Sequence, residues 1–115
     1  MQEIYKKTIL VDLDGVLSDY KGNYDKKYIP PIRKGAKNFL EELSKTYEIK
    51  IFTSRSLKIT TEWLIDNKLN QIISDVTNIK VPAHLIIDDR AICHNGNFEK
   101  TIKDIKSFEV YWKLS

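Results

Sequence analysis

Short apolar runs that end abruptly at small polar or acidic residues recur along this chain. Short continuous runs of this kind are typical of strands that are buried on both faces in a parallel sheet. Between the runs, apolar residues recur every three or four positions, which is typical of helices that bury one face. The pattern predicts strands over 8–11, 48–53, 72–76 and 84–87, and helices over 33–45, after a cap at Thr60 or Thr61, and over 98–106.

Three segments lack a clear period. Residues 15–31 are mostly turn-like, with two glycines and the pair Pro30-Pro31. Asn95-Gly96 predicts a tight hairpin or a loop. The apolar residues of 108–112 fit strand alternation and helical spacing equally well.

Strands that alternate with helices predict an α/β domain in which right-handed crossovers build a parallel sheet covered by helices. In such open sheets, ligands bind beyond the carboxyl ends of the strands. The three clearest strands end at Asp12, at Thr53-Ser54 and at Asp88-Asp89. We therefore expect these side chains to converge on one site.

Composition narrows the class of protein. The 115 residues have an ordinary globular composition and fit a single domain over 1–115. The net charge of +3 is too small to indicate a nucleic-acid-binding protein, so nucleic acid is expected only as a substrate. A single cysteine, Cys93, excludes an internal disulfide. Without a signal-peptide pattern at the N-terminus or an apolar run long enough to span a bilayer, the expected location is the cytoplasm, away from membranes.

Acidic pairs follow two of the predicted strands. Asp12 stands at the tip of the first predicted strand, and Asp14 lies next to Gly15, where the chain can turn sharply. Taken alone, this pair is also compatible with carboxylates that only cap a turn. Asp88 and Asp89 repel each other at a buried strand end unless a cation or a proton intervenes. A divalent ion with oxygen ligands relieves such repulsion.

Two further elements indicate little by themselves. Thr53-Ser54-Arg55 alone fits a helix cap, and Lys80 alone fits a solvated surface lysine. Together with the acidic pairs, however, they resemble the four motifs of the haloacid-dehalogenase (HAD) superfamily of phosphohydrolases. The motifs appear in the family's order, with no motif position substituted, as ILVDLDGVL over 9–17, KIFTSR over 50–55, Lys80, and LIIDDR over 85–90.

The resemblance implies a three-layer, Rossmann-like (HAD-like) fold, with a mainly parallel sheet and helices on both faces. It also implies Mg²⁺-dependent hydrolysis of phosphomonoesters. Asp12 would attack phosphorus and become an aspartyl phosphate, while Asp14 would protonate the leaving oxygen and then activate water. Mg²⁺ would bind Asp12, the backbone carbonyl of Asp14, and Asp88 or Asp89. The phosphoryl group would be contacted by Thr53, the backbone around Ser54, and Lys80. Arg55 and Arg90 flank motif residues, and each fits either a contact with phosphate or a structural ion pair.

The spacing of the motifs bears on access to the site. Relatives in this superfamily insert cap domains after the first motif or between the second and third. Neither the interval from Asp14 to Thr53 nor that from Thr53 to Lys80 has room for a folded cap. We therefore expect an open site with only a small flap over about 15–31. Tyrosines recur in this flap among lysines, and they fit either packing against the sheet or contact with a nucleobase or second phosphate: Tyr20, Tyr24 and Tyr28.

Two other functions fit the same scaffold. One is a phosphoacceptor like the receiver domains of two-component signalling, although those carry their paired acids after the first strand rather than late in the chain. The other is an interaction domain without catalytic activity, which the intact motifs disfavour. As a phosphatase, the protein would act on a phosphorylated small molecule or on the phosphorylated end of a macromolecule.

Overall fold

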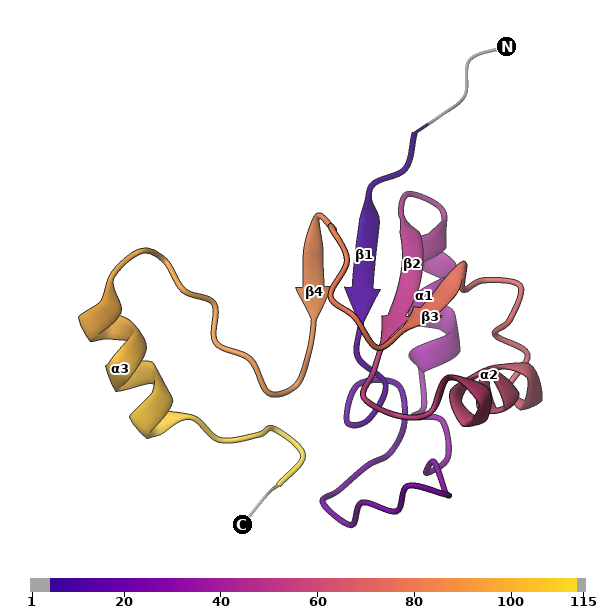
Figure 1. The fold of residues 1–115 in the computed structure, drawn as a ribbon, viewed down its shortest axis with the longest axis horizontal. Coiled ribbons are helices and arrows are strands. Elements are labelled where there is room, and N and C mark those ends of the chain that lie inside the picture. Colours follow the sequence, from indigo (N-terminus) through magenta and orange to yellow (C-terminus); the bar gives the residue numbers. More distant parts are fainter. Residues whose placement is uncertain (1–4, 114–115) are drawn as a thin grey trace.

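Four parallel strands form one sheet in the structure, a computed structural model that describes residues 5–113. They are arranged in the order β3-β2-β1-β4 (Figure 1). Because all four run the same way, their carboxyl ends lie at one edge of the sheet. The prediction of an α/β fold with a parallel sheet is confirmed. The strands are β1 (Thr8–Val11), β2 (Glu48–Phe52), β3 (Asp75–Thr77) and β4 (Leu85–Ile87).

Two helices, α1 (Ala36–Ser44) and α2 (Leu57–Asp66), pack against β2 and β3 respectively. Alternate residues of β1 and β2 point into the same core as the apolar stripes of these helices, so both helices cover one face. Loop residues that follow β1 are also fully buried there, which fixes the path of the chain directly after Asp12. The core contains, among others, Ile9, Val11, Leu13, Leu17, Leu40, Ile49, Ile51 and Leu64.

The third helix, α3 (Phe98–Ser107), stands apart from the sheet (Figure 1) and packs on no other helix or strand of residues 5–113. Its apolar residues Phe98, Ile102 and Ile105 are exposed. The expected cover of helices on both faces is therefore found on one face only. A helix that joins two parallel strands is held against the sheet by both of them. Helix α3 instead follows the last strand, and β3 is joined to β4 by a loop without a helix.

The start of α2 differs from the prediction by about one turn. The helix begins at Leu57, and the hydroxyl of Ser56 caps it by accepting a hydrogen bond from the Ile59 amide at 3.4 Å. Thr60 is buried inside the helix. The predicted cap at Thr60 or Thr61 is wrong, because Ser56 satisfies the same free amides earlier in the chain.

The predicted strand over 72–76 is also displaced, since β3 begins at Asp75. The Ile73 amide bonds to the Leu69 carbonyl in a turn, and both side chains are buried. An apolar turn thus gave a strand-like signal. Asn95-Gly96 lies in the loop before α3 and forms no hairpin.

Residues 15–31, the flap, form an irregular loop beyond the carboxyl edge of the sheet. Two backbone hydrogen bonds close its base, from the Asp19 amide to the Pro31 carbonyl and from the Arg33 amide to the Leu17 carbonyl, both at 2.8 Å. No cap domain is present in the described part of the chain. None of its helices has the length and apolar character needed to cross a membrane.

Candidate active site

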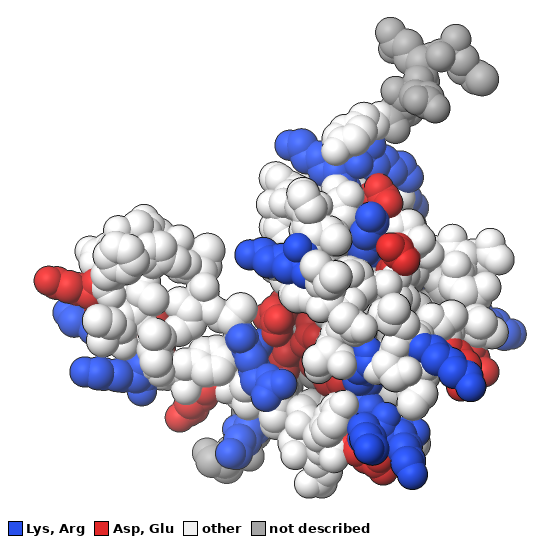
Figure 2. All heavy atoms as spheres, in the orientation of Figure 1, with Lys and Arg blue, Asp and Glu red and all other residues white. Residues whose placement is uncertain are grey.

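Three carboxylates meet where β1 and β4 end. The Asp12 amide bonds to the Ile87 carbonyl at 2.9 Å, which brings the residue after β1 beside the two residues after β4. One carboxylate oxygen from each of Asp12, Asp88 and Asp89 lies within 4.8 Å of the others. Acidic side chains gather at this edge, with basic ones next to them (Figure 2). The predicted convergence of these strand ends is therefore present.

The electrostatics of the cluster are those of crowded, partly buried acids. Burial, the hydrogen bond with Asp89 and the charges of Asp88 and Asp89 raise the pKa of Asp12 from 3.8 to about 8. Burial alone would raise the pKa of Asp89 too, but hydrogen bonds from Asp12 and Trp112 outweigh it and lower that pKa. Without a cation, the raised pKa of Asp12 therefore lets it retain a proton at a pH where a solvated aspartate has lost its own.

The arrangement fits a small divalent cation. The Asp89 Oδ1 atom is buried and has no hydrogen-bond partner among the described residues. Gly15 has a φ of +83°, and a Cβ on it would collide with the Asp89 carboxylate, so the chain turns closely around this side chain. Carboxylate oxygens are hard ligands of the kind that bind Mg²⁺. Asp12, Asp88 and Asp89 are close enough together to hold such an ion.

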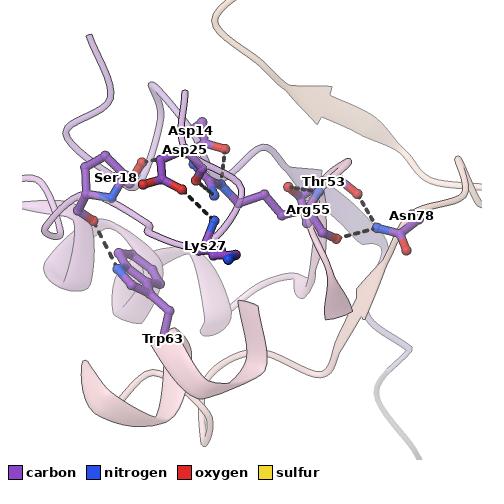
Figure 3. Close-up of polar contacts among 9 residues, drawn as sticks. Asp14, Ser18, Asp25, Lys27, Thr53, Arg55, Trp63 and Asn78 are labelled. Atoms are coloured by element: carbon purple, nitrogen blue, oxygen red, sulfur yellow. Dashed lines mark hydrogen bonds and ion pairs between the residues drawn. The ribbon is translucent and has the colours of Figure 1, made fainter. Parts of the chain in front are cut away.

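The Asp14 carboxylate is directed toward Arg55 and Ser18 (Figure 3). Its Oδ2 accepts a hydrogen bond from Arg55 Nε at 2.7 Å, and its Oδ1 accepts one from the Ser18 hydroxyl at 3.2 Å. The Arg55 side chain is 1% exposed, so this is a nearly buried ion pair. Of the two alternatives for Arg55, the structure has the ion pair, and Arg55 Nη1 also donates to the Asp25 carbonyl of the flap at 2.8 Å.

Thr53 and Ser54 form the loop at the end of β2. Thr53 is buried, and its Oγ1 accepts a hydrogen bond from the Arg55 amide at 3.1 Å. Asn78 Nδ2 donates to the carbonyls of Thr53 at 2.6 Å and Arg55 at 2.8 Å, and so fixes the path of this loop (Figure 3). The sequence reasoning missed Asn78. It directly follows β3, so the rule that sites lie at strand ends would have found it had β3 been placed correctly.

Two cavities open onto these residues. The first has a volume of about 430 Å³ and the second about 330 Å³. Asp12, Thr53, Ser54 and Arg90 line both. The first is also lined by Phe52, Asn78 and Asp88, and the second by Asp14, Tyr20 and Tyr24.

Lys80 and Arg90 differ in their position relative to the two cavities. Lys80 lies exposed in the loop between β3 and β4 and lines neither cavity. Arg90 lines both, and its backbone amide donates to Asp88 Oδ1 at 2.9 Å. Of the described residues that line these two cavities together with Asp12, Arg90 is the one with a cationic side chain.

The C-terminal segment 108–113 returns to the site from α3. Trp112 Nε1 donates to Asp89 Oδ2 at 2.5 Å, and its ring packs edge-on against Tyr20 with centroids 5.3 Å apart. The Tyr111 hydroxyl donates to the Gly15 carbonyl. No local sequence signal marks these contacts, because they join residues that are far apart in the chain.

A parallel sheet with acids after its first and fourth strands and a Thr-Ser loop after its second defines a HAD-like domain. The family model of the NLI interacting factor-like phosphatases (NIF) matches residues 7–110, so the chain belongs to this HAD-superfamily phosphatase family. The resemblance inferred from the motifs is confirmed.

A solved structure shares the fold. It is described as a conserved protein from Bacteroides thetaiotaomicron, and it matches with a TM-score of 0.59 and 18% sequence identity over 89% of this chain and 91% of that one. No curated protein matches this sequence.

Proposed function

We propose that the protein is a Mg²⁺-dependent phosphomonoester hydrolase that forms an aspartyl phosphate on Asp12. One observation carries the proposal. The partly buried Asp12 lines both cavities and lies within the acidic cluster, with Asp88 at the first cavity and Asp14 at the second. Membership of a phosphatase family supports the reaction class.

In the first half-reaction, an Asp12 oxygen attacks phosphorus while the bond from phosphorus to the leaving oxygen breaks. Asp14 is paired with Arg55 as a carboxylate in this structure, so it must take up a proton before this step. That proton then passes to the leaving oxygen, and the alcohol departs. In the second, Asp14 takes a proton from water as the water oxygen attacks phosphorus. This step releases phosphate, and Asp12 becomes a free carboxylate again.

Asp12, Asp88 and Asp89 would hold Mg²⁺, which when bound neutralises their charge and that of the phosphoryl group. Thr53 accepts a hydrogen bond from the Arg55 amide, so its own hydroxyl hydrogen is free to donate to a phosphoryl oxygen. The Ser54 backbone is available at the same place. We assign the cationic contact to Arg90 rather than Lys80, because Arg90 borders both cavities.

The test is release of phosphate from p-nitrophenyl phosphate with Mg²⁺, with EDTA, and by the Asp12→Asn variant. We expect turnover by the wild type with Mg²⁺ only, and no turnover by the variant, whose amide is nearly isosteric but not nucleophilic. Full activity in EDTA, or wild-type activity of Asp12→Asn, would contradict the proposal. A single stoichiometric phosphorylation without turnover would indicate a phosphoacceptor instead.

A further inference from the structure

Arg55 joins the proposed acid/base to the flap. We propose that Arg55 is a positioning residue that couples the tip of the flap, residues 24–28, to Asp14, so that protonation of the leaving group depends on the flap being in place. The proposal rests on the proposed function, because it assigns Asp14 the role of acid.

The side of Arg55 that faces Asp14 is rigid. Its Nε donates to Asp14 Oδ2 at 2.7 Å, and the two side chains are 1% and 14% exposed. A charge pair this far from water is costly to break, because each partner would be left without compensation. The position of the Asp14 carboxylate is therefore set by Arg55 on one oxygen and by Ser18 on the other.

The opposite side of the guanidinium holds the flap tip. Nη1 donates to the Asp25 carbonyl at 2.8 Å, and the guanidinium carbon lies 4.6 Å from the centre of the Tyr24 ring. Asp25 in turn accepts a hydrogen bond from the Lys27 amide at 2.9 Å, which shapes the turn at the tip.

The base of the flap is held independently. Leu17 and Ile29 are buried in the core, and the backbone hydrogen bonds at Asp19 and Arg33 close the loop. Loss of Arg55 contacts should therefore release the tip without unfolding the flap.

The second cavity indicates where the leaving group of a substrate would lie. Asp14 and Tyr24 line the second cavity but not the first, whereas Asp12 lines both. A phosphoryl group at Asp12 would thus have its leaving oxygen on the side of Asp14 and the flap. Arg55 lies behind this wall and lines neither cavity, so it acts on the reaction only through Asp14 and Tyr24.

A comparison of substrates with good and poor leaving groups distinguishes the positioning role of Arg55 from a purely structural role. A nitrophenolate departs without a proton, whereas an alkoxide needs one. In Arg55→Lys, which keeps the charge but loses the planar donor fork, we expect kcat/KM to fall about tenfold or less for 2,4-dinitrophenyl phosphate. For alkyl phosphates it should fall by about 10²- to 10³-fold. In Tyr24→Leu, kcat/KM should likewise fall more for alkyl phosphates than for 2,4-dinitrophenyl phosphate. This variant frees the flap tip but retains the hydrogen bond from Arg55 to Asp14.

Arg33→Lys is the matched control. Arg33 also pairs with an aspartate of the flap, Asp19 at 3.1 Å, and lies 5.3 Å from the centre of the Tyr111 ring, but it makes no contact with Asp14. Any loss in this variant should be the same for all leaving groups.

A second readout does not depend on activity. Trypsin should cut after Lys26 or Lys27 several-fold faster in Arg55→Lys than in the wild type, with the sites located by mass spectrometry. Cleavage at the exposed Lys100 and Lys103 of α3 serves as the internal reference.

A loss that is equal for all leaving groups, an unchanged leaving-group dependence in Tyr24→Leu, or unchanged cleavage at the flap tip would overturn the coupling alone. Absence of any Asp12-dependent turnover in the wild type would overturn the proposed function and this inference together.

Discussion

Asp12 is the residue whose surroundings constrain the chemistry most. Its pKa is raised from 3.8 to about 8 by burial first, and then by the hydrogen bond with Asp89 and the charges of Asp88 and Asp89. At a pH between these two pKa values, Asp12 of the folded, metal-free protein carries a proton that it does not carry in the unfolded chain. The free energy of unfolding must therefore fall as pH rises through this window.

The first prediction follows for the protein in EDTA. Its melting temperature should fall from pH 5 to pH 8, and the Asp12→Asn variant should lose most of this fall and be the more stable protein at pH 8. Thermal unfolding followed by circular dichroism measures both. Asp66→Asn, at an exposed position of α2, should keep the wild-type dependence. A wild-type protein whose stability is flat over this range would show that Asp12 is not crowded by its neighbours.

A second residue-scale prediction concerns the close turn at Gly15. Gly15 and Gly35 have similar φ values, +83° and +88°, but a Cβ on Gly15 would meet Asp89 and Trp112, while one on Gly35 would meet nothing within 4 Å. Alanine at Gly35 should cost only the backbone strain, about 1 kcal/mol. Alanine at Gly15 should lower the free energy of unfolding by more than alanine at Gly35 does, and it should also weaken Mg²⁺ binding. Urea unfolding and a Mg²⁺ titration measure the two effects, and equal effects at both glycines would exclude a role for the close approach.

At the scale of elements, the apolar pattern explains which predictions from the sequence succeeded. The strands β1, β2 and β4 match because each is a short apolar run that ends at the polar residues of the site, although β4 is itself only partly buried. The start of α2 and the position of β3 were misplaced, because Ser56 and Thr60 are both good caps and because Ile73 is buried from a turn rather than from a strand. Competition of this kind is decided by tertiary packing, which a local pattern does not contain.

Helix α3 was predicted within one residue, yet its apolar face is not covered. This gives a prediction for stability. Ile105 is 59% exposed, whereas Ile51 is fully buried in the central strand β2. Ile105→Ala should change the free energy of unfolding by less than about 0.5 kcal/mol, and Ile51→Ala should lower it by about 2–5 kcal/mol. A cost at Ile105 as large as that at Ile51 would mean that α3 packs against the sheet in solution.

At the scale of the whole molecule, the site joins segments from both ends of the chain. The rule that ligands bind beyond the strand ends was sufficient to bring Asp12, Thr53 and the Asp88-Asp89 pair together. It did not indicate Arg55 as the partner of Asp14, nor Trp112 as the partner of Asp89. Those contacts depend on how the flap and the C-terminal segment fold back, and neither has a periodic pattern.

The return of the C-terminal segment makes Trp112 a reporter of the metal site. Its indole N–H donates a hydrogen bond to Asp89. The other tryptophan, Trp63, donates instead to the Pro30 carbonyl, at 3.1 Å, and to none of the three acids. Addition of Mg²⁺ should change the intrinsic fluorescence, and Trp112→Phe should abolish the change. A response that persists in Trp112→Phe would place the metal or the C-terminal segment elsewhere.

The central claim is that Asp12 carries the phosphoryl group during turnover. The most direct measurement is peptide mapping by mass spectrometry after the protein is mixed with Mg²⁺ and p-nitrophenyl phosphate and quenched in acid. Asp14→Asn should accumulate the adduct, because it lacks the base that activates water but still allows attack on an ester with a good leaving group. We expect one phosphoryl group on Asp12 in Asp14→Asn and none in Asp12→Asn. Turnover by the wild type, together with no phosphoryl group on Asp12 in the wild type or in Asp14→Asn, would contradict the account.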